Sequence, residues 1–300
     1  MNLLGVDDIS KEQIEGIFQI AEELSQGKCT RSINESAVLA LLFEKPSTRT
    51  RMSFEAAMEK LGGSAVYIDA KSTQMARGEP LEDTARVMSF YSDFIVVRMN
   101  HHEDVLKFAS SASVPVINGL SDMAHPSQAL TDMYTIGIAK KRVKGIRIAF
   151  TGDIAQNTAN SLILAATKLG AQVALIGPKN YPPNSKYLIR AREYGVVDVY
   201  DDLKEGLANA DIVYTDTFVS MGFEDEAEKR RKMFAPYQIN AETLAYASSG
   251  AQVMHPLPAF RGEEITADVI DGPRSLVWEQ AKNKLLLAQA IILYLSEKRA

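Results

Sequence analysis

Short apolar runs alternate with longer amphipathic stretches along most of the chain. The runs that read as buried strands are 37–43, 65–68, 94–97, 114–117, 146–150, 173–176, 212–214 and 252–254. The stretches with helical periodicity are 48–61, 81–91, 103–109, 128–140, 157–169, 185–194 and 280–295. This alternation is typical of parallel sheets whose strands are joined by helices.

The alternation occurs in two series, before and after a basic stretch at 140–144 that is followed by Gly145. A chain of 300 residues suits two cores, because single cores stop growing near ~250 to 300 residues. We therefore predict an α/β protein of two domains, 1–135 and 145–279, each an open parallel sheet flanked by helices. The C-terminal helix, about 280–300, is expected to cross back to the first domain.

Composition and charge narrow the class of ligand. The chain is 46% hydrophobic and 24% charged, as in globular enzymes, and its net charge of −5 disfavours nucleic acid and anionic membranes as partners. An anionic ligand would then need a local arginine cluster.

The single cysteine, Cys29, excludes an internal disulfide. The acidic residues within 1–25 are unlike a signal peptide, and no apolar run approaches ~20 residues, so we expect a cytoplasmic protein.

The run Ser47–Arg51, S-T-R-T-R, lies where an apolar strand gives way to a helix. Free backbone N–H groups, three hydroxyls and two guanidinium groups at such a junction can hold a doubly charged oxyanion. The alternative is a helix start with solvated arginines. Arg49 and Arg51 diverge by about 200° on a helix, so both can face one ligand only where the turn unwinds.

Other polar segments follow predicted strands in the first half of the chain. His125 can donate to a carbonyl oxygen that gains charge, and Gln128 can hold an amide nitrogen, although a lone histidine can equally be a core or cap residue. Gln74 lies in a polar loop that is either a mobile lid or a solvated turn.

The second half offers three further strand ends. The segment from Gly152 to Asn157 lacks the G-x-G-x-x-G fingerprint, so no dinucleotide is indicated. Asp216 places a carboxylate before a loop with a glycine hinge, or in a structural turn. The stiff segment His255–Phe260 contains two prolines and can present the Leu257 carbonyl as a fixed acceptor.

Together these segments resemble the aspartate/ornithine carbamoyltransferase family over essentially the whole chain. The motifs that carry the resemblance are F-E-K-P-S-T-R-T-R-M-S-F-E (43–55), G-E-P-L-E-D-T-A-R-V (78–87), H-P-S-Q-A-L-T-D (125–132), D-x-x-x-S-M-G (216–222) and H-P-L-P-A-x-R-G-E-E (255–264). The resemblance implies transfer of a carbamoyl group from carbamoyl phosphate to an amine, with no metal or redox cofactor.

The resemblance also implies roles for individual residues. The phosphate would be held by Ser47, Thr48, Arg49 and Thr50, and the carbamoyl end by Arg98, His125 and Gln128, with Leu257 and Lys284 completing that site. Gln74 matches a family glutamine that reaches into a neighbouring chain's site. That match implies a homotrimer, or a multiple of one, with shared active sites.

The acceptor is expected to be L-ornithine, which gives L-citrulline and phosphate. Where the aspartate branch has an arginine and a lysine, this chain has Asn157 and Gln74. Asn157 would bind the amino-acid end of ornithine, with Ser220 and Met221 beside it, and Asp216 would orient the δ-amine. The catalytic set implied is then Arg49, Arg98, His125 and Asp216.

Two positions depart from the ornithine branch. Pro256 stands where those enzymes have a cysteine, and H-P-L-P is the spelling of the aspartate branch. Lys284 stands where the family has an arginine, so a planar donor fork becomes a point charge. The alternatives are therefore transfer to aspartate, putrescine or another amine, or a non-catalytic protein that binds carbamoyl phosphate.

Overall fold

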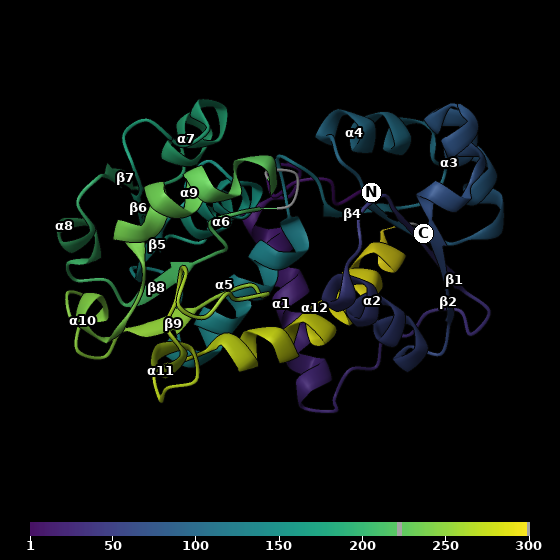
Figure 1. Ribbon diagram of the computed structural model, residues 1–300. Helices are drawn as coiled ribbons and strands as arrows, with labels where there is room; N and C mark the ends of the chain where they lie inside the picture. The colour runs from purple at the N-terminus through teal and green to yellow at the C-terminus, as the bar shows by residue number, and fades with distance from the viewer. Residues whose placement is uncertain (221–223, 299–300) are drawn as a thin grey trace. The chain divides into compact units, whose positions relative to one another are not determined.

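The computed structural model describes residues 1–220 and 224–298, which form two compact units (Figure 1). The first unit holds Met1–Thr131 and the stretch from Lys282 onward, and the second is Asp132–Ala281. The chain therefore changes unit inside α5 (Pro126–Lys140) and again inside α12 (Val277–Glu297). The fold class is as predicted, with two open parallel sheets and a C-terminal helix that belongs mostly to the first unit.

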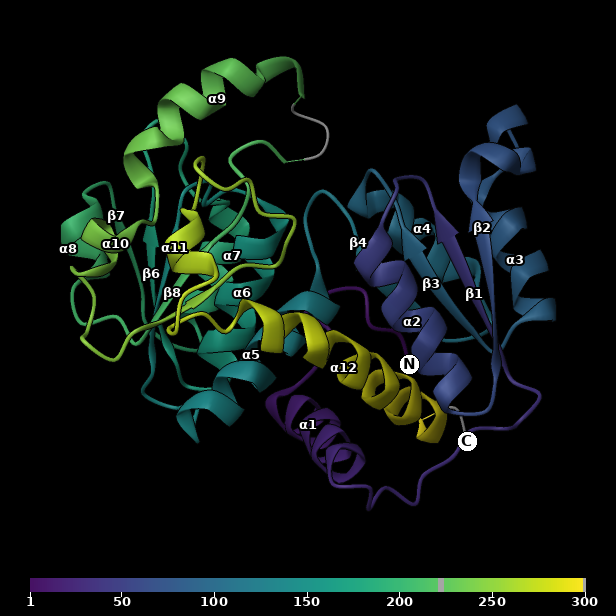
Figure 2. The same ribbon diagram turned by 60° about the horizontal axis from the view of Figure 1, so that its bottom comes forward.

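The first unit is built on a four-stranded parallel sheet in the order β2-β1-β3-β4. Its strands are β1 (Val38–Phe43), β2 (Ser64–Asp69), β3 (Phe94–Arg98) and β4 (Val116–Leu120). Its helices are α1 (Lys11–Ser25), α2 (Thr48–Lys60), α3 (Leu81–Tyr91) and α4 (His102–Ser111), with short 3-10 turns η1 (Ala70–Ser72) and η2 (Gln74–Arg77). Figures 1 and 2 show α3 and α4 on one face of this sheet and α2 with α12 on the other.

The central strands of this sheet are apolar up to Arg98 at the end of β3, because both of their faces are covered. The strands β1 and β3 read V-L-A-L-L-F and F-I-V-V-R, and nearly all of these side chains are buried. One core cluster joins alternate residues of β1, β3 and β4 to the inner faces of α3 and α4. Of the helices in the described part of the chain, none is both long and apolar enough to cross a membrane.

Strand β4 differs from the sequence-based expectation of 114–117. It begins at Val116 because Pro115 has no N–H to contribute to the ladder, and it continues through Asn118 and Gly119 to Leu120. A register irregularity opposite Val97 and Arg98 accompanies this extension.

The second unit carries a five-stranded parallel sheet in the order β7-β6-β5-β8-β9. Its strands are β5 (Arg147–Thr151), β6 (Gln172–Ile176), β7 (Val197–Tyr200), β8 (Ile212–Thr215) and β9 (Gln252–Met254). Its other helices are α6 (Asn157–Lys168), α7 (Ser185–Arg192), α8 (Leu203–Leu207), α9 (Ala227–Phe234), α10 (Ala241–Leu244) and α11 (Ala267–Ile270), with η3 (Glu224–Glu226) and η4 (Ala235–Tyr237). Residues of α8 to α11 pack in one cluster against alternate residues of β5, β6, β8 and β9.

The order of the strands determines which polar loops become neighbours. In the first unit β1, β3 and β4 are adjacent and parallel, so the segments that follow them share one edge of the sheet. In the second unit β5, β8 and β9 are adjacent in the same way. Ligands of open parallel sheets bind at these carboxyl ends, and the two edges are therefore where the candidate residues gather.

Candidate active site

The first cluster begins at the N-terminus of α2, directly after β1. Ser47 caps the helix with an extended backbone, and its side chain makes no capping hydrogen bond. The helix begins at Thr48, its first turn carries no acidic residue, and Thr50 is buried. The first N–H groups of a helix have no acceptor within the helix, and together with the positive end of its dipole they favour an anion at such a point.

Arg98, the last residue of β3, brings a second guanidinium group to the same edge. Its side chain is buried, and burial together with the nearby charge of Arg49 lowers the pKa of Arg98 to about 10. Within residues 1–220 and 224–298, the Arg98 Nε has no hydrogen-bond partner and the guanidinium forms no ion pair. Arg98 therefore stays charged at neutral pH, and a bound oxyanion would satisfy a donor that the protein leaves unused.

His125 lies beside these cations, just before α5. It is buried, and burial lowers its pKa well below the ordinary value, helped by the charges of Lys284 and Arg98. The imidazole is thus neutral at physiological pH. A neutral imidazole can donate a hydrogen bond to an oxygen that gains negative charge.

Lys284 and Gln128 complete the first cluster from α12 and α5. The Lys284 Nζ donates to the Gln128 Oε1 over 2.6 Å, and both side chains are buried. Because an ammonium group can only donate, this hydrogen bond orients the Gln128 side chain with its amide oxygen facing Lys284. The structure thus brings together Arg49, Arg98, His125, Gln128 and Lys284, and their binding of carbamoyl phosphate stays a prediction.

Arg51 does not belong to this cluster. It pairs with Glu55 over 2.9 Å and lies 3.5 Å over the centre of the Tyr67 ring. Because α2 is already helical at Thr48, the turn does not unwind and only the first arginine of the run adjoins Arg98. Gln74 begins η2 with an exposed side chain, so its role in a neighbouring chain stays a prediction.

The second cluster lies at the carboxyl edge of the second sheet and centres on Asp216. This side chain follows β8 and is buried, and burial raises its pKa. The opposing influences include two hydrogen bonds, from the Thr217 N–H at 2.7 Å from the Asp216 Oδ1 and from Thr158. Thr158 also lies 3.2 Å from the Asn157 Oδ1, which places Asn157 and Asp216 on either side of one hydroxyl.

Ser220 joins this cluster through Gln156. The Ser220 Oγ donates to the Gln156 Oε1 over 2.8 Å, and Gln156 caps α6 immediately before Asn157. The Gln156 Nε2 is buried and has no partner within the described residues. Met221 falls outside those residues, so its predicted place beside ornithine stays a prediction.

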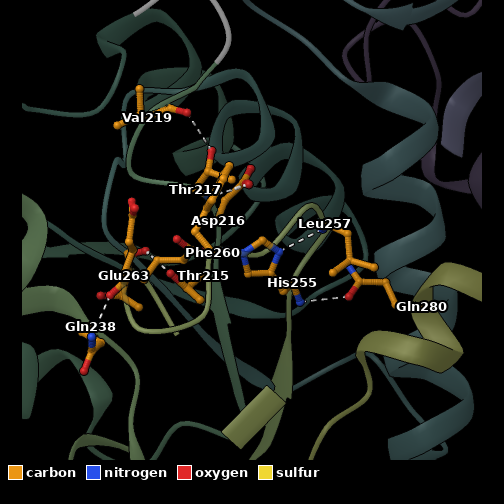
Figure 3. Close-up of polar contacts among 12 residues, drawn as sticks. Thr215, Asp216, Thr217, Val219, Gln238, His255, Leu257, Phe260, Glu263 and Gln280 are labelled. Carbon is orange, nitrogen blue, oxygen red and sulfur yellow. Dashed lines mark hydrogen bonds and ion pairs between the residues drawn. The ribbon is translucent and has the colours of Figure 1, made fainter. Parts of the chain in front are cut away.

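The His255–Phe260 segment follows β9, and Figure 3 shows the His255 ring beside Asp216. The Leu257 N–H donates to the His255 Nδ1 over 2.9 Å, so the proton of a neutral ring lies on Nε2, which faces the buried Glu264 carboxylate at 3.0 Å. The Phe260 N–H also binds Glu264. Leu257 has a φ of 60°, a left-handed conformation that this network holds in place.

Sequence reasoning missed the contacts that support the Asp216 loop. Arg230 in α9 forms a buried ion pair with Asp153, and its Nε donates to the Phe218 carbonyl over 3.0 Å. Thr158 and Gln156 were also not singled out. The position of Gly152 and Asp153 directly after a strand indicates a functional loop. The partner of Asp153 is Arg230, which lies 77 residues away along the chain and cannot be paired with it from the sequence. Within the described residues, no three His, Cys, Asp or Glu side chains gather as ligands for a metal ion.

Two family models match the chain, one in each half. The carbamoyl-P binding domain of aspartate/ornithine carbamoyltransferase matches residues 1–137, and the Asp/Orn binding domain matches residues 144–295. Two curated relatives are named ornithine carbamoyltransferase. The one from Pyrococcus abyssi is 45% identical over 97% of this chain and 94% of its own, and the one from Bacillus subtilis is 43% identical over 97% and 92%.

Solved structures show the same likeness. The ornithine carbamoyltransferase of Pyrococcus furiosus superposes with a TM-score of 0.91 at 45% identity, covering 97% of this chain and 95% of that one. The anabolic ornithine carbamoyltransferase of Campylobacter jejuni gives a TM-score of 0.93 at 36% identity and covers 99% of both chains. The chain therefore belongs to the aspartate/ornithine carbamoyltransferase family.

Proposed function

We propose that this protein transfers the carbamoyl group of carbamoyl phosphate to the δ-amine of L-ornithine, giving L-citrulline and phosphate. The observation that carries the proposal is the buried set of Arg98, His125 and Lys284 around Gln128, with Arg49 beside Arg98. This set offers donors for a phosphate dianion and for a carbonyl oxygen. Relatives at 43–45% identity bear the ornithine carbamoyltransferase name, which supports ornithine as the acceptor.

The reaction is a direct displacement in this proposal. The δ-nitrogen of ornithine forms a bond to the carbamoyl carbon, the carbon–oxygen bond to phosphate breaks, and the proton lost by the amine leaves with phosphate or solvent. Arg49 and Thr50 would hold the departing phosphate. Arg98 and neutral His125 would stabilise the tetrahedral oxyanion, and oxyanion donors of this kind contribute about 3 to 4 kcal/mol each.

The second cluster supports recognition of the acceptor. Asn157 offers an amide to the amino-acid end of ornithine, and Ser220 is tied to the residue before it. Asp216 can orient the δ-amine by a hydrogen bond. Alignment of two bound reactants supplies about 7 to 11 kcal/mol of the barrier reduction in reactions of this type.

We further propose a cytoplasmic homotrimer in which Gln74 of one chain completes the site of another. The exposed position of Gln74 on η2 supports this assignment. The compartment follows from the sequence-based expectation alone.

A panel of acceptors tests the proposed function. The purified protein is incubated with carbamoyl phosphate and L-ornithine, L-aspartate or putrescine, and the carbamoylated products are separated and quantified. We expect citrulline as the main product. N-carbamoylaspartate as the main product would reassign the acceptor, in line with the H-P-L-P spelling around Pro256, and binding of carbamoyl phosphate without any product would indicate a non-catalytic protein.

A further inference from the structure

A buried glutamine outside the predicted site links three separate parts of the second unit. Gln280 is only 1% exposed and lies near the start of α12. Its Oε1 accepts the His255 N–H at 3.0 Å, and its Nε2 donates to the Asp132 Oδ1 at 2.7 Å. Figure 3 shows the Gln280 amide reaching the backbone of His255. One planar amide thus joins α12, the segment after β9, and α5.

Tyr214, on β8, contacts both Asp132 and Gln280. Its hydroxyl donates to the Asp132 Oδ2 over 2.9 Å and lies 3.2 Å from the Gln280 Nε2. Its ring stacks on Phe150 at a centroid distance of 5.3 Å. Tyr214 is two residues before Asp216. The strand that leads to Asp216 is therefore held by the Gln280 amide and the Asp132 carboxylate.

The partners leave the amide only one orientation. A flipped Gln280 would aim its oxygen at the Asp132 carboxylate and its NH₂ group at the His255 N–H, and both contacts would be repulsive. A buried amide that loses a partner carries a desolvation cost, so the arrangement is held as a unit.

Two other N–H groups of the same segment also have defined acceptors. The N–H of Leu257 binds the His255 ring, the N–H of Phe260 binds Glu264, and Pro256 and Pro258 have no N–H. The His255 N–H is the point at which the segment leaves the sheet, and Gln280 is its acceptor. Gln280 therefore adds a side-chain link between this segment and Tyr214 of β8 at the point where the ladder between β8 and β9 ends.

We propose that Gln280 is a positioning residue for the acceptor half of the site. It holds the His255–Phe260 segment and the end of β8 in register through Asp132 and Tyr214, and so fixes Asp216 against His255. This inference rests on the proposed function. It assigns no contact between Gln280 and a substrate.

The test compares Gln280→Leu with Glu279→Gln, an exposed neighbour on the same helix. We expect Gln280→Leu to raise the KM for ornithine at least tenfold and to lower kcat. The Kd for carbamoyl phosphate, measured by calorimetry, should change far less than the KM for ornithine, since Leu257 is the one predicted carbamoyl-phosphate ligand on the segment that Gln280 holds and the others lie in the first unit. Glu279→Gln should match the unchanged protein in all three quantities.

A second variant covers the case in which Gln280→Leu does not fold. Tyr214→Phe keeps the stacked ring and removes only the hydroxyl, and it should raise the KM for ornithine about threefold or more, again with a smaller change in the Kd for carbamoyl phosphate. An unchanged KM for ornithine in the folded variants, or an equal loss for both substrates, overturns the positioning role. Absence of citrulline from the unchanged protein would instead overturn the proposed function.

Discussion

At the scale of single residues, the cations Arg49, Arg98 and Lys284 lie close together beside His125. Arg98 is buried with its Nε unpartnered within the described residues, and burial and the charge of Arg49 both lower its pKa. Burying positive groups without a counter-charge is costly, and a bound phosphate compound offsets that cost. The same arrangement keeps His125 neutral and able to donate.

Replacement of Arg49 tests the phosphate end of this cluster. We expect Arg49→Ala to lower kcat/KM for carbamoyl phosphate by roughly 10² to 10³, as for loss of one donor to developing charge. Lys60→Ala, which removes an exposed cation from the last turn of the same helix, is the control and should change little. Steady-state kinetics measure both variants, and full turnover by Arg49→Ala would refute the assignment.

The lowered pKa of His125 predicts a dependence of stability on pH. Below the ordinary histidine pKa of about 6.5 the unfolded chain binds a proton at this position that the folded chain does not, so the free energy of unfolding falls as pH falls. This single group contributes a slope of up to about 1.4 kcal/mol per pH unit. Urea unfolding between pH 7.5 and 5.5 should show a shallower pH dependence for His125→Asn, and equal slopes would contradict a neutral, buried His125.

At the scale of secondary structure, the order of the strands in each sheet determines which segments form each cluster. The segments after β1, β3 and β4, and after β5, β8 and β9, meet because those strands are neighbours. The apolar runs and the S-T-R-T-R junction therefore predict which strand ends meet there, whereas only the family resemblance places Lys284 with them. Arg98 could be placed at the end of its strand from the sequence alone.

Elements with weak hydrophobic patterns could not be predicted. Strand β7 is only partly buried at an edge, and α9 reads A-E-K-R-R-K-M-F, which looks like a solvated charge run. Its buried Arg230 is explained only by Asp153 and Phe218, which lie far away in sequence. The role of Gln280 cannot be predicted from the sequence for the same reason, since its partners are Asp132, Tyr214 and His255.

The role of α9 leads to a prediction at this scale. Arg230→Met should lower the free energy of unfolding by about 3 to 5 kcal/mol, because it leaves Asp153 as an unpaired buried charge. It should also raise the KM for ornithine, since the Phe218 carbonyl in the loop after Asp216 loses its donor. The neighbouring Arg231→Met, which breaks an exposed pair with Glu263, should cost at most about 1 kcal/mol. Denaturant midpoints that are equal for the two variants would contradict this account.

At the scale of the whole molecule, the proposed sharing of sites between chains can be tested by complementation. Gln74→Ala and Arg49→Ala chains, each expected to be nearly inactive alone, are co-expressed and the mixed oligomers are purified through two different tags. If Gln74 acts in a neighbour's site, about a third of the sites in the purified mixed trimers hold both residues intact and activity returns. Mixed oligomers as inactive as the parent variants would show that each chain uses its own Gln74 or none.

The central claim is that a carbamoyl group moves from phosphate to the δ-nitrogen of ornithine. Carbamoyl phosphate labelled with ¹³C and ornithine labelled with ¹⁵N at the δ-position allow that bond to be observed directly by NMR. We expect a product whose carbamoyl carbon shows one-bond coupling to the δ-nitrogen, formed in equal amount to the phosphate released. Release of phosphate while the ¹³C label appears in a product without that coupling would contradict the account.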